Sequence, residues 1–238
     1  GATDPVLTAG GLTKVSLKID FNANVPGQTW NGVRKLSLEI GSSSGPLSEG
    51  FAWQLHRLAA EAGYYHYESA NAAWVKLYVN GDFHGVYSST EQRDEQFLRN
   101  HEIYSETATW LYKADGSTVL EHGIGDSPTF NHLDFAPFVK RTGGGPGGSG
   151  PDLEIDLPQW IDMESMLTLG ACNAYVENAD ELFKNNGKNS FAVDFLPSNE
   201  RLRRYYPWDL DSSIKSGTDT VFGISNPIFD EPWFQRVY

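Results

Sequence analysis

The sequence predicts an α+β fold with two lobes in a single domain. Three observations support this prediction: several short segments alternate apolar and polar residues, two longer segments have helical spacing, and an Asn-Gly pair separates two of the strand-like segments. The 238 residues suit one large domain with a shared core. A hydrophobic content of 39% and a charged content of 21% are typical of a folded chain.

The N-terminal lobe, about residues 1–100, is expected to consist of strands around one helix. Residues 12–20 and 34–40 alternate apolar and polar side chains, which predicts two strands. A helix is expected to begin at the N-cap Ser48 and to end near Gly63. Its expected buried face consists of Phe51, Leu55, Leu58 and Ala62.

A β-hairpin is predicted next. Residues 73–79 and 83–88 read as strands, and they flank Asn80-Gly81-Asp82. Asn-Gly tolerates positive φ at both positions, which a tight hairpin turn requires. A short helix within 90–99 is expected to follow.

The C-terminal lobe, about residues 101–238, is predicted to hold one helix and further strands. The helix is expected to run from Pro158 towards Asn178. Its expected buried stripe is Trp160, Met163, Leu167, Ala171 and Ala174. The expected strands are 110–113, 190–195 and 202–206, and the Gly-rich run 143–150 is expected to form a surface loop. We expect the part after the last strand to be short for such a lobe.

Charge and composition exclude several function classes. The formal net charge of −13 opposes binding to a phosphate backbone, so we expect no nucleic-acid partner. No apolar run approaches the roughly 20 residues that cross a bilayer, so we expect no transmembrane segment. Cys172 is the only cysteine, which excludes a disulfide framework and a cysteine-based metal cluster.

The segment 178–211 holds the residues with the clearest chemistry. Asp180 ends the predicted helix, Asn189 directly precedes a strand, and Asp209 and Asp211 follow the next strand. Their oxygens are hard ligands that suit Mg²⁺ or Mn²⁺, with phosphate oxygens completing the shell. The same order of Asp, Asn and Asp occurs in the catalytic loop and metal site of protein kinases.

Motifs throughout the chain resemble the CotH kinase family, the spore-coat-protein-H-type atypical protein kinases. The similarity covers nearly the whole chain. The motifs that carry it are LKIDFN at 17–22, GVRKLSLE at 32–39, EGFAWQLHRLAAEAG at 49–63, VKLYVNGDFHGVYSSTEQRDEQFL at 75–98, WLYK at 110–113, NAD at 178–180, KN at 188–189 and YYPWDLD at 205–211.

The resemblance implies an atypical Ser/Thr protein kinase that uses ATP with Mg²⁺ or Mn²⁺. Asp180 matches the proposed catalytic Asp, and Asp209 matches the metal-binding Asp. The second metal ligand is Asn189 or Asn185, and we favour Asn189 because it directly precedes the strand. Asp211 is expected to add a second carboxylate at the metal.

Two lysines are candidates for the nucleotide phosphates. Kinases pair a strand lysine with a glutamate on the following helix. Lys35 precedes the predicted helix that carries Glu49 and Glu61, whereas Lys113 lies in a family motif. Glu91 follows the hairpin, where a hinge segment would contact adenine.

Two other functions remain open at this stage. Asp209-Leu210-Asp211 is also a D-x-D motif, as in glycosyltransferases that bind nucleotide sugars. The second alternative is a non-catalytic surface-binding or adhesion module on a kinase-like fold. The expected partner of a kinase is a protein with a Ser or Thr acceptor and, given the acidic chain, a basic segment around it. The resemblance implies an extracytoplasmic place, either secreted or associated with the spore or cell surface.

Overall fold

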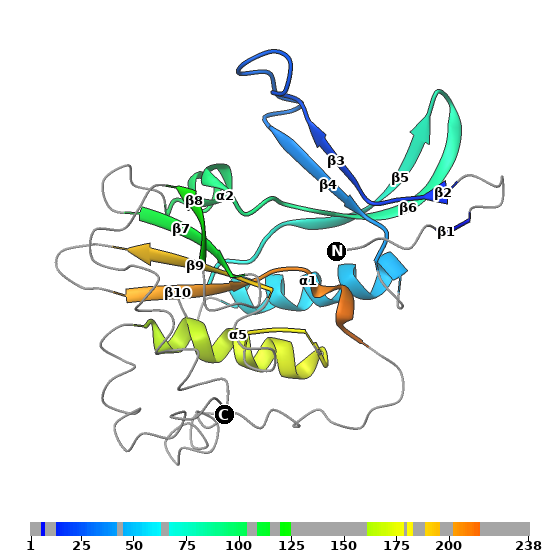
Figure 1. Ribbon diagram of the computed structural model, residues 1–238. Helices are drawn as coiled ribbons and strands as arrows, with labels where there is room; N and C mark the ends of the chain where they lie inside the picture. The colour runs from blue at the N-terminus through cyan, green and yellow to red at the C-terminus, as the bar shows by residue number, and fades with distance from the viewer. Residues whose placement is uncertain are drawn as a thin grey trace.

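The chain forms an α+β structure built on two antiparallel sheets (Figure 1). The computed structural model describes residues 6–7, 13–41, 45–62, 67–103, 109–114, 120–124, 161–178, 180–182, 189–195 and 202–214. Ahead of the two sheets, the short strands β1 (Val6–Leu7) and β2 (Thr13–Lys14) pair with each other.

The first sheet has the strand order β3-β4-β6-β5. Its strands are β3 (Leu17–Asp20), β4 (Lys35–Glu39), β5 (Ala72–Val79) and β6 (Asp82–Thr90). The predicted hairpin is confirmed, and its turn has Asn80 at φ 52° and Gly81 at φ 92°. The predicted strand 34–40 is also confirmed, whereas the predicted strand 12–20 is divided between β2 and β3.

The two faces of the first sheet differ in chemistry. One face carries the apolar residues Leu38, Ile40 and Tyr87, which form a small core of their own. On the other face, the register pairs Glu39 with Ser88 and Ser88 with Trp74, so these three side chains point the same way. The indole Nε1 of Trp74 donates a hydrogen bond to the carbonyl of Pro46 in helix α1 (Gly45–Glu61) at 3.0 Å. The polar face of the sheet is therefore the one that α1 covers.

The predicted start of α1 was wrong, and of its predicted buried face only Leu55 packs, half-buried, against the core. The helix begins at Gly45, before Ser48. Phe51 and Leu58 are 58% and 57% exposed, and the side chains that the helix buries are Glu49, Ala52, Trp53 and His56. The apolar stripe is not the buried one because the covered sheet face is polar. Gly63 lies outside the described residues.

The second sheet has the strand order β10-β9-β7-β8. Its strands are β7 (Thr109–Ala114), β8 (Leu120–Ile124), β9 (Ser190–Phe195) and β10 (Leu202–Pro207), so the predicted strands 110–113, 190–195 and 202–206 are confirmed. Helix α5 (Met163–Tyr175) contacts β10 and α1 (Figure 1).

Helix α5 also differs from its prediction. It begins after the N-cap Asp162, not at Pro158. Of the predicted stripe, Ala171 is exposed, Met163 and Leu167 are half-buried, and Ala174 is buried. Met166, Leu169 and Cys172 are also among the residues that the helix buries. Pro158, Trp160 and the Gly-rich run 143–150 lie outside the described residues.

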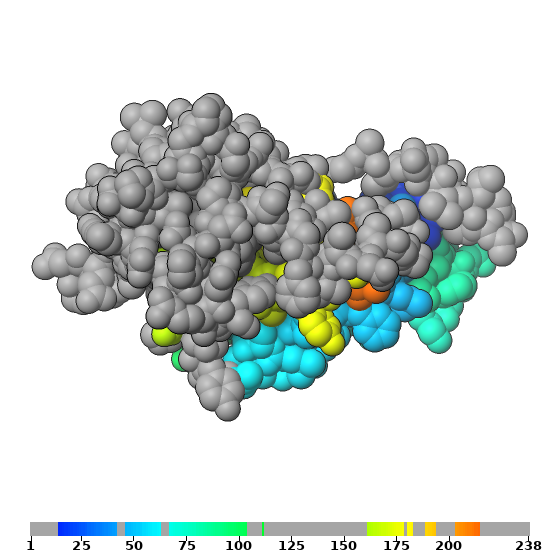
Figure 2. All heavy atoms as spheres, turned by 90° about the horizontal axis from the view of Figure 1, so that it is seen from below, coloured from blue at the N-terminus to red at the C-terminus, as the bar shows by residue number. Residues whose placement is uncertain are grey.

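A larger hydrophobic core lies among α1, helix α2 (Glu95–Asn100) and the second sheet, with the half-buried Ala72 of β5 packed against it. It takes Trp53 from α1, Phe97 from α2, Val193 from β9 and Tyr206 from β10, among others. The 3-10 helix η2 (Leu210–Ser212) contacts α1. In Figure 2 the orange surface near residue 210 accordingly lies against the blue surface of α1. In the part of the chain that the structure describes, no helix has the length and apolar character to span a membrane.

Candidate active site

Asp180 and Asn189 lie side by side. The side-chain amide of Asn189 donates hydrogen bonds to the Asp180 carboxylate at 3.0 Å and to the Asp180 backbone carbonyl at 3.1 Å. Asn189 has φ 50°, a left-handed conformation that Asn tolerates better than most residues. This arrangement holds the Asp180 carboxylate in place directly before β9. Asn185 lies outside the described residues, so its place relative to Asp180 is not described.

A backbone hydrogen bond connects this pair to Asp209. The amide of Trp208 donates to the carbonyl of Asn189 at 3.0 Å. Asp209 follows directly, with φ 53° and ψ 61°, and its side chain makes no capping hydrogen bond to η2. A left-handed non-glycine residue costs conformational energy, and such residues concentrate at functional sites.

The electrostatics place several carboxylates in one region. Burial, followed by the neighbouring charges of Asp211, Glu39 and Asp180, raises the pKa of Asp209 to about 6. Carboxylates that interact in this way resist ionising together. Asp209 therefore interacts electrostatically with Asp180 and Asp211, and a nearby cation would relieve this shared negative charge.

Glu49 of α1 interacts electrostatically with the same carboxylates. It is 2% exposed, and burial raises its pKa to about 8, with further contributions from Glu39, Asp209 and Asp211. Its Oε1 accepts a hydrogen bond from the Trp53 indole at 3.3 Å, whereas its buried Oε2 has no partner among the described residues. A buried carboxyl group with few hydrogen bonds favours its neutral, protonated form, in agreement with this raised pKa.

The carboxylates do not form a complete protein cage for a metal. Among the described residues, no group of three or more His, Cys, Asp or Glu side chains is arranged to hold a metal ion. The donor set still fits Mg²⁺ or Mn²⁺, because these ions are commonly held by one or two carboxylates with phosphate and water oxygens. Asp209, Asn189 and Asp211 are the residues that would hold such an ion.

A family model described as CotH kinase protein matches residues 9–236. The chain belongs to the CotH kinase family. A search of curated proteins finds no match. The family match spans both sheets of this CotH kinase domain, as well as Asp180, Asn189 and Asp209.

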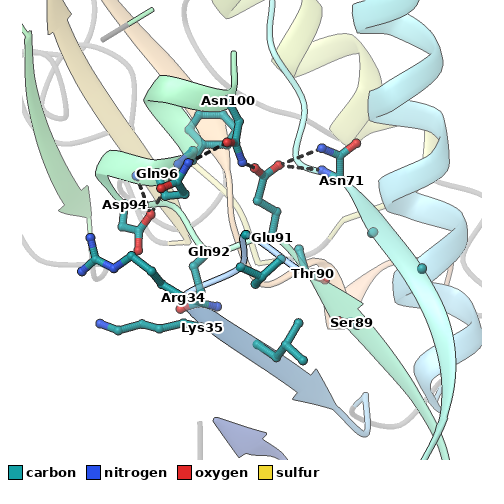
Figure 3. Close-up of a pocket in the computed structure, with 16 residues that line it drawn as sticks. Arg34, Lys35, Asn71, Ser89, Thr90, Glu91, Gln92, Asp94, Gln96 and Asn100 are labelled. Carbon is teal, nitrogen blue, oxygen red and sulfur yellow. Dashed lines mark hydrogen bonds between the residues drawn. The ribbon is translucent and has the colours of Figure 1, made fainter. Parts of the chain in front are cut away.

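The CotH kinase domain also has a pocket of about 310 Å³ at the end of the first sheet that lies opposite the Asn80-Gly81 turn. It is lined by the start of β4, the end of β6 and helix α2. Figure 3 shows Glu91 between Asn71 and Asn100, with Arg34 and Lys35 across the pocket. Asp180, Asn189, Asp209 and Asp211 are not among its lining residues.

Glu91 in this pocket is held as an anion. Burial alone raises its pKa, but hydrogen bonds from His101, Asn100 and Asn71 outweigh burial and lower the pKa below its usual value. Asn71 donates from its backbone and its side chain, both at 3.1 Å, and Asn100 donates at 2.7 Å. The Glu91 carboxylate therefore fixes the segment after β6 against β5 and α2.

The expected pairing of Lys35 with a helix glutamate is wrong. Lys35 Nζ lies 3.8 Å from the carboxylate of Asp20, and Glu61 pairs instead with Arg57. The expectation failed because the register places Asp20 of β3 directly opposite Lys35 of β4. Lys113 lies in β7, and its side chain is outside the described part of the structure.

The sequence analysis missed Arg93. Its buried guanidinium lies 4.5 Å from the Trp53 ring and 5.0 Å from the Phe97 ring. It donates hydrogen bonds to the carbonyls of Glu91 at 2.9 Å and Pro207 at 3.2 Å. Arg93 thus ties the segment after β6 to the turn before Asp209. No local pattern signals this role, because every contact except that with Glu91 and Phe97 is distant in sequence.

Proposed function

We propose that this CotH kinase domain is an atypical protein kinase, a transferase that moves the γ-phosphoryl group of ATP to a Ser or Thr hydroxyl of a protein. The observation that carries the proposal is the connection of Asp180 to Asn189 and, through Trp208, to Asp209. Phosphoryl transfer relies on positioning and on charge neutralisation, and these are the two tasks that such residues perform.

Asp180 is the catalytic residue in this proposal. Its carboxylate accepts the hydrogen bond of the attacking hydroxyl and takes up its proton. The amide of Asn189 orients that carboxylate by holding both its side chain and its backbone carbonyl. Orientation of this kind is worth orders of magnitude in rate.

Asp209, Asn189 and Asp211 are the proposed ligands of Mg²⁺ or Mn²⁺. The bound ion supplies positive charge to the phosphate oxygens of ATP. The repulsion that raises the pKa of Asp209 supports this role, because a cation would relieve it. Asn189 would have its amide oxygen available to a metal while its amide nitrogen serves Asp180.

The nucleotide is proposed to contact Lys35, Lys113 and Glu91. Lys35 and Glu91 line the same pocket, whose volume suits a nucleobase with part of its sugar. Along β4, the distance from Lys35 to Glu39 is roughly 13 Å at the usual rise of a strand. This length is similar to that of an extended nucleoside triphosphate, which would connect the pocket to the carboxylates.

The proposed partner is a protein substrate with a Ser or Thr acceptor in a basic segment, since the chain is acidic. The family name supports an association with the spore coat, and we propose a secreted or surface-associated place for this domain.

A thermal-shift screen of ligands tests this function. We expect ATP with Mg²⁺ or Mn²⁺ to raise the melting temperature more than ATP or the metal alone, because a ligand that binds only the folded form stabilises it. Asp209→Asn should abolish the additional shift, whereas Asp180→Asn should keep it and lose phosphoryl transfer to a protein substrate. Asp82→Asn, on the exposed hairpin, is the matched control.

Two outcomes would replace the proposal. A larger shift with a nucleotide sugar than with ATP would indicate a D-x-D glycosyltransferase. The absence of a shift with any nucleotide would indicate a non-catalytic binding module.

A further inference from the structure

The C-terminal end of helix α5 leads directly to Asp180. The helix ends in a Schellman motif, in which Glu177 takes the left-handed conformation with φ 53°. Both hydrogen bonds of this motif are present. The amide of Asn178 donates to the carbonyl of Asn173 at 2.9 Å, and the amide of Glu177 donates to the carbonyl of Ala174 at 3.1 Å. The backbone of Asn178 is therefore fixed two residues before Asp180 without any use of the Asn178 side chain.

The side chain of Asn178 holds Asp180. Its Oδ1 accepts a hydrogen bond from the backbone amide of Asp180 at 3.1 Å, which is the local pattern of an Asx-turn. Asn189 holds the carboxylate and the backbone carbonyl of the same residue. The catalytic candidate is thus fixed at its amide by one asparagine and at its carbonyl and carboxylate by another.

Buried hydrogen bonds orient the side chain of Asn178 in turn. Its Nδ2 donates to Oδ1 of Asn173 at 3.5 Å, and Nδ2 of Asn173 donates to Oε2 of Glu181 at 3.3 Å. Asn173, Asn178 and Glu181 are at most 2% exposed. Away from water such hydrogen bonds are strengthened, and the loss of one partner is costly. Because the nitrogen of the Asn178 amide is directed to Asn173, its oxygen is directed to Asp180.

The same helix end is also bonded to the segment that follows Asp209. The amide of Ile214 donates to the carbonyl of Val176, the C-cap of α5, at 2.7 Å. Carbonyls at the end of a helix have no partner within the helix and are available for such contacts. The end of α5 therefore anchors the segment of Asp180 directly and the segment after Asp209 through Ile214.

We propose that Asn178 is a positioning residue, oriented by Asn173 and Glu181, which directs Asp180 towards the substrate hydroxyl by fixing its backbone amide. The effect on phosphoryl transfer rests on the proposed kinase function, whereas the effect on the local order of Asp180 does not. Asn178 is not among the proposed ligands of the metal or of ATP. Its loss should therefore slow the chemical step and leave nucleotide binding unchanged.

Asn178→Ala and Asn178→Ser are a matched pair of variants that differ by one hydroxyl group. Both keep the backbone hydrogen bonds of the Schellman motif. We expect Asn178→Ala to lower kcat for a protein substrate by about tenfold or more with an unchanged KM for ATP, because a misdirected catalytic group loses rate and not binding. Asn178→Ser should recover part of the loss, since its hydroxyl can accept from the Asp180 amide.

Thr168→Ala is the control within the same helix. It removes a hydrogen bond of 2.9 Å from the side chain of Thr168 to the carbonyl of Glu164, in the first half of α5. Its kcat should equal that of the parent. An equal loss of kcat in Thr168→Ala and Asn178→Ala would indicate a general effect of helix stability and would contradict the positioning role.

Hydrogen exchange of the Asp180 amide, followed by NMR, tests the geometry without nucleotide or substrate. Exchange should be about tenfold faster in Asn178→Ala than in the parent and intermediate in Asn178→Ser. Asn173→Ala keeps the side chain of Asn178 but removes the group that orients it, so exchange at Asp180 should again be faster. Asn178→Ser and Asn173→Ala also give the answer if Asn178→Ala does not fold.

The inference is overturned if Asp180 exchanges at the parent rate in Asn178→Ala, or if Asn178→Ser is as impaired as Asn178→Ala. Its failure can be separated from failure of the proposed function. Faster exchange in these variants of a protein that transfers no phosphate would uphold the positioning of Asp180 and remove the kinase proposal. Transfer by the parent with an unchanged kcat in Asn178→Ala would do the reverse.

Discussion

The amide of Asn189 holds the catalytic candidate Asp180 by its carboxylate and by its backbone carbonyl, at 3.0 and 3.1 Å. The two residues are nine positions apart, and Asn189 directly precedes β9. The contact therefore holds Asp180 against the start of this strand. Because the carbonyl of Asn189 also accepts from Trp208, this single residue connects the proposed catalytic and metal-binding carboxylates.

Replacing Asn189 by Asp should reduce phosphoryl transfer by about 100-fold, because the donor to Asp180 is lost and a like charge is added. Asp tolerates the left-handed backbone nearly as well as Asn, so the change in stability should be small. Steady-state kinetics with the melting temperature of the same variant would check this. Equal activity of Asn189→Asp and the parent would contradict the positioning role.

Replacing Arg93 by Ala should lower the free energy of unfolding by about 3 kcal/mol or more. The change leaves a cavity between Trp53 and Phe97 and removes the donor to two carbonyls. Arg93→Lys should cost less, because it keeps a donor but not the planar stack. Urea unfolding measures both.

The control for this prediction is Arg99→Ala. Arg99 is exposed and pairs with Glu95 at 2.7 Å within α2. Its loss should cost only about 0.5 kcal/mol. If Arg93→Ala were as mild as Arg99→Ala, the buried guanidinium would not join the two sheets energetically.

The metal-free protein should lose stability as the pH rises from about 5 to 8. The folded pKa values of Glu49, about 8, and of Asp209, about 6, lie above their ordinary values, so the folded state keeps protons that the unfolded state releases. Stability from these groups is therefore complete at low pH and declines as the pH approaches the folded values. Thermal unfolding across this range in the presence of a chelator measures the effect.

Glu49→Gln isolates the contribution of that residue. Its stability should depend less on pH than that of the parent between pH 5 and 8, since the amide does not titrate. The buried His56 has the opposite effect on stability in acid. Burial lowers its pKa to about 3, so the stability that it contributes is lost as the pH falls below 6.5, the ordinary pKa of histidine. Parallel pH curves for the parent and Glu49→Gln would contradict the prediction.

Replacing Gly50 by Ala should destabilise the protein by about 1 kcal/mol, although Ala favours a helix. An added Cβ would overlap the indole of Trp74, which is fixed by its hydrogen bond to Pro46. In a Trp74→Leu background the same change should instead stabilise, by up to about 1 kcal/mol, because only helix propensity remains. Chemical denaturation of the four proteins in this cycle gives the answer.

Much of the fold could be predicted from the sequence because its signals are local. The Asn80-Gly81 turn has the positive φ values that the residue types permit, and the hairpin follows. The strands β7, β9 and β10 match their alternation closely. The order of Asp180, Asn189 and Asp209, together with the resemblance to the CotH kinase family, predicted that these residues approach one another, and the hydrogen bond from Asn189 to Asp180 agrees with that expectation.

The tertiary structure decided which side chains these elements present to each other. The apolar stripe with Phe51 and Leu58 predicted the wrong face of α1. The helix packs on the polar face of the first sheet, and the pairing of the strands that creates this face cannot be deduced from the helix sequence. The register of β3 and β4 likewise pairs Lys35 with Asp20 and not with a glutamate of the helix. Residue type and spacing fix local conformation, but charge pairing depends on contacts between distant segments, and these exist only once the chain has folded.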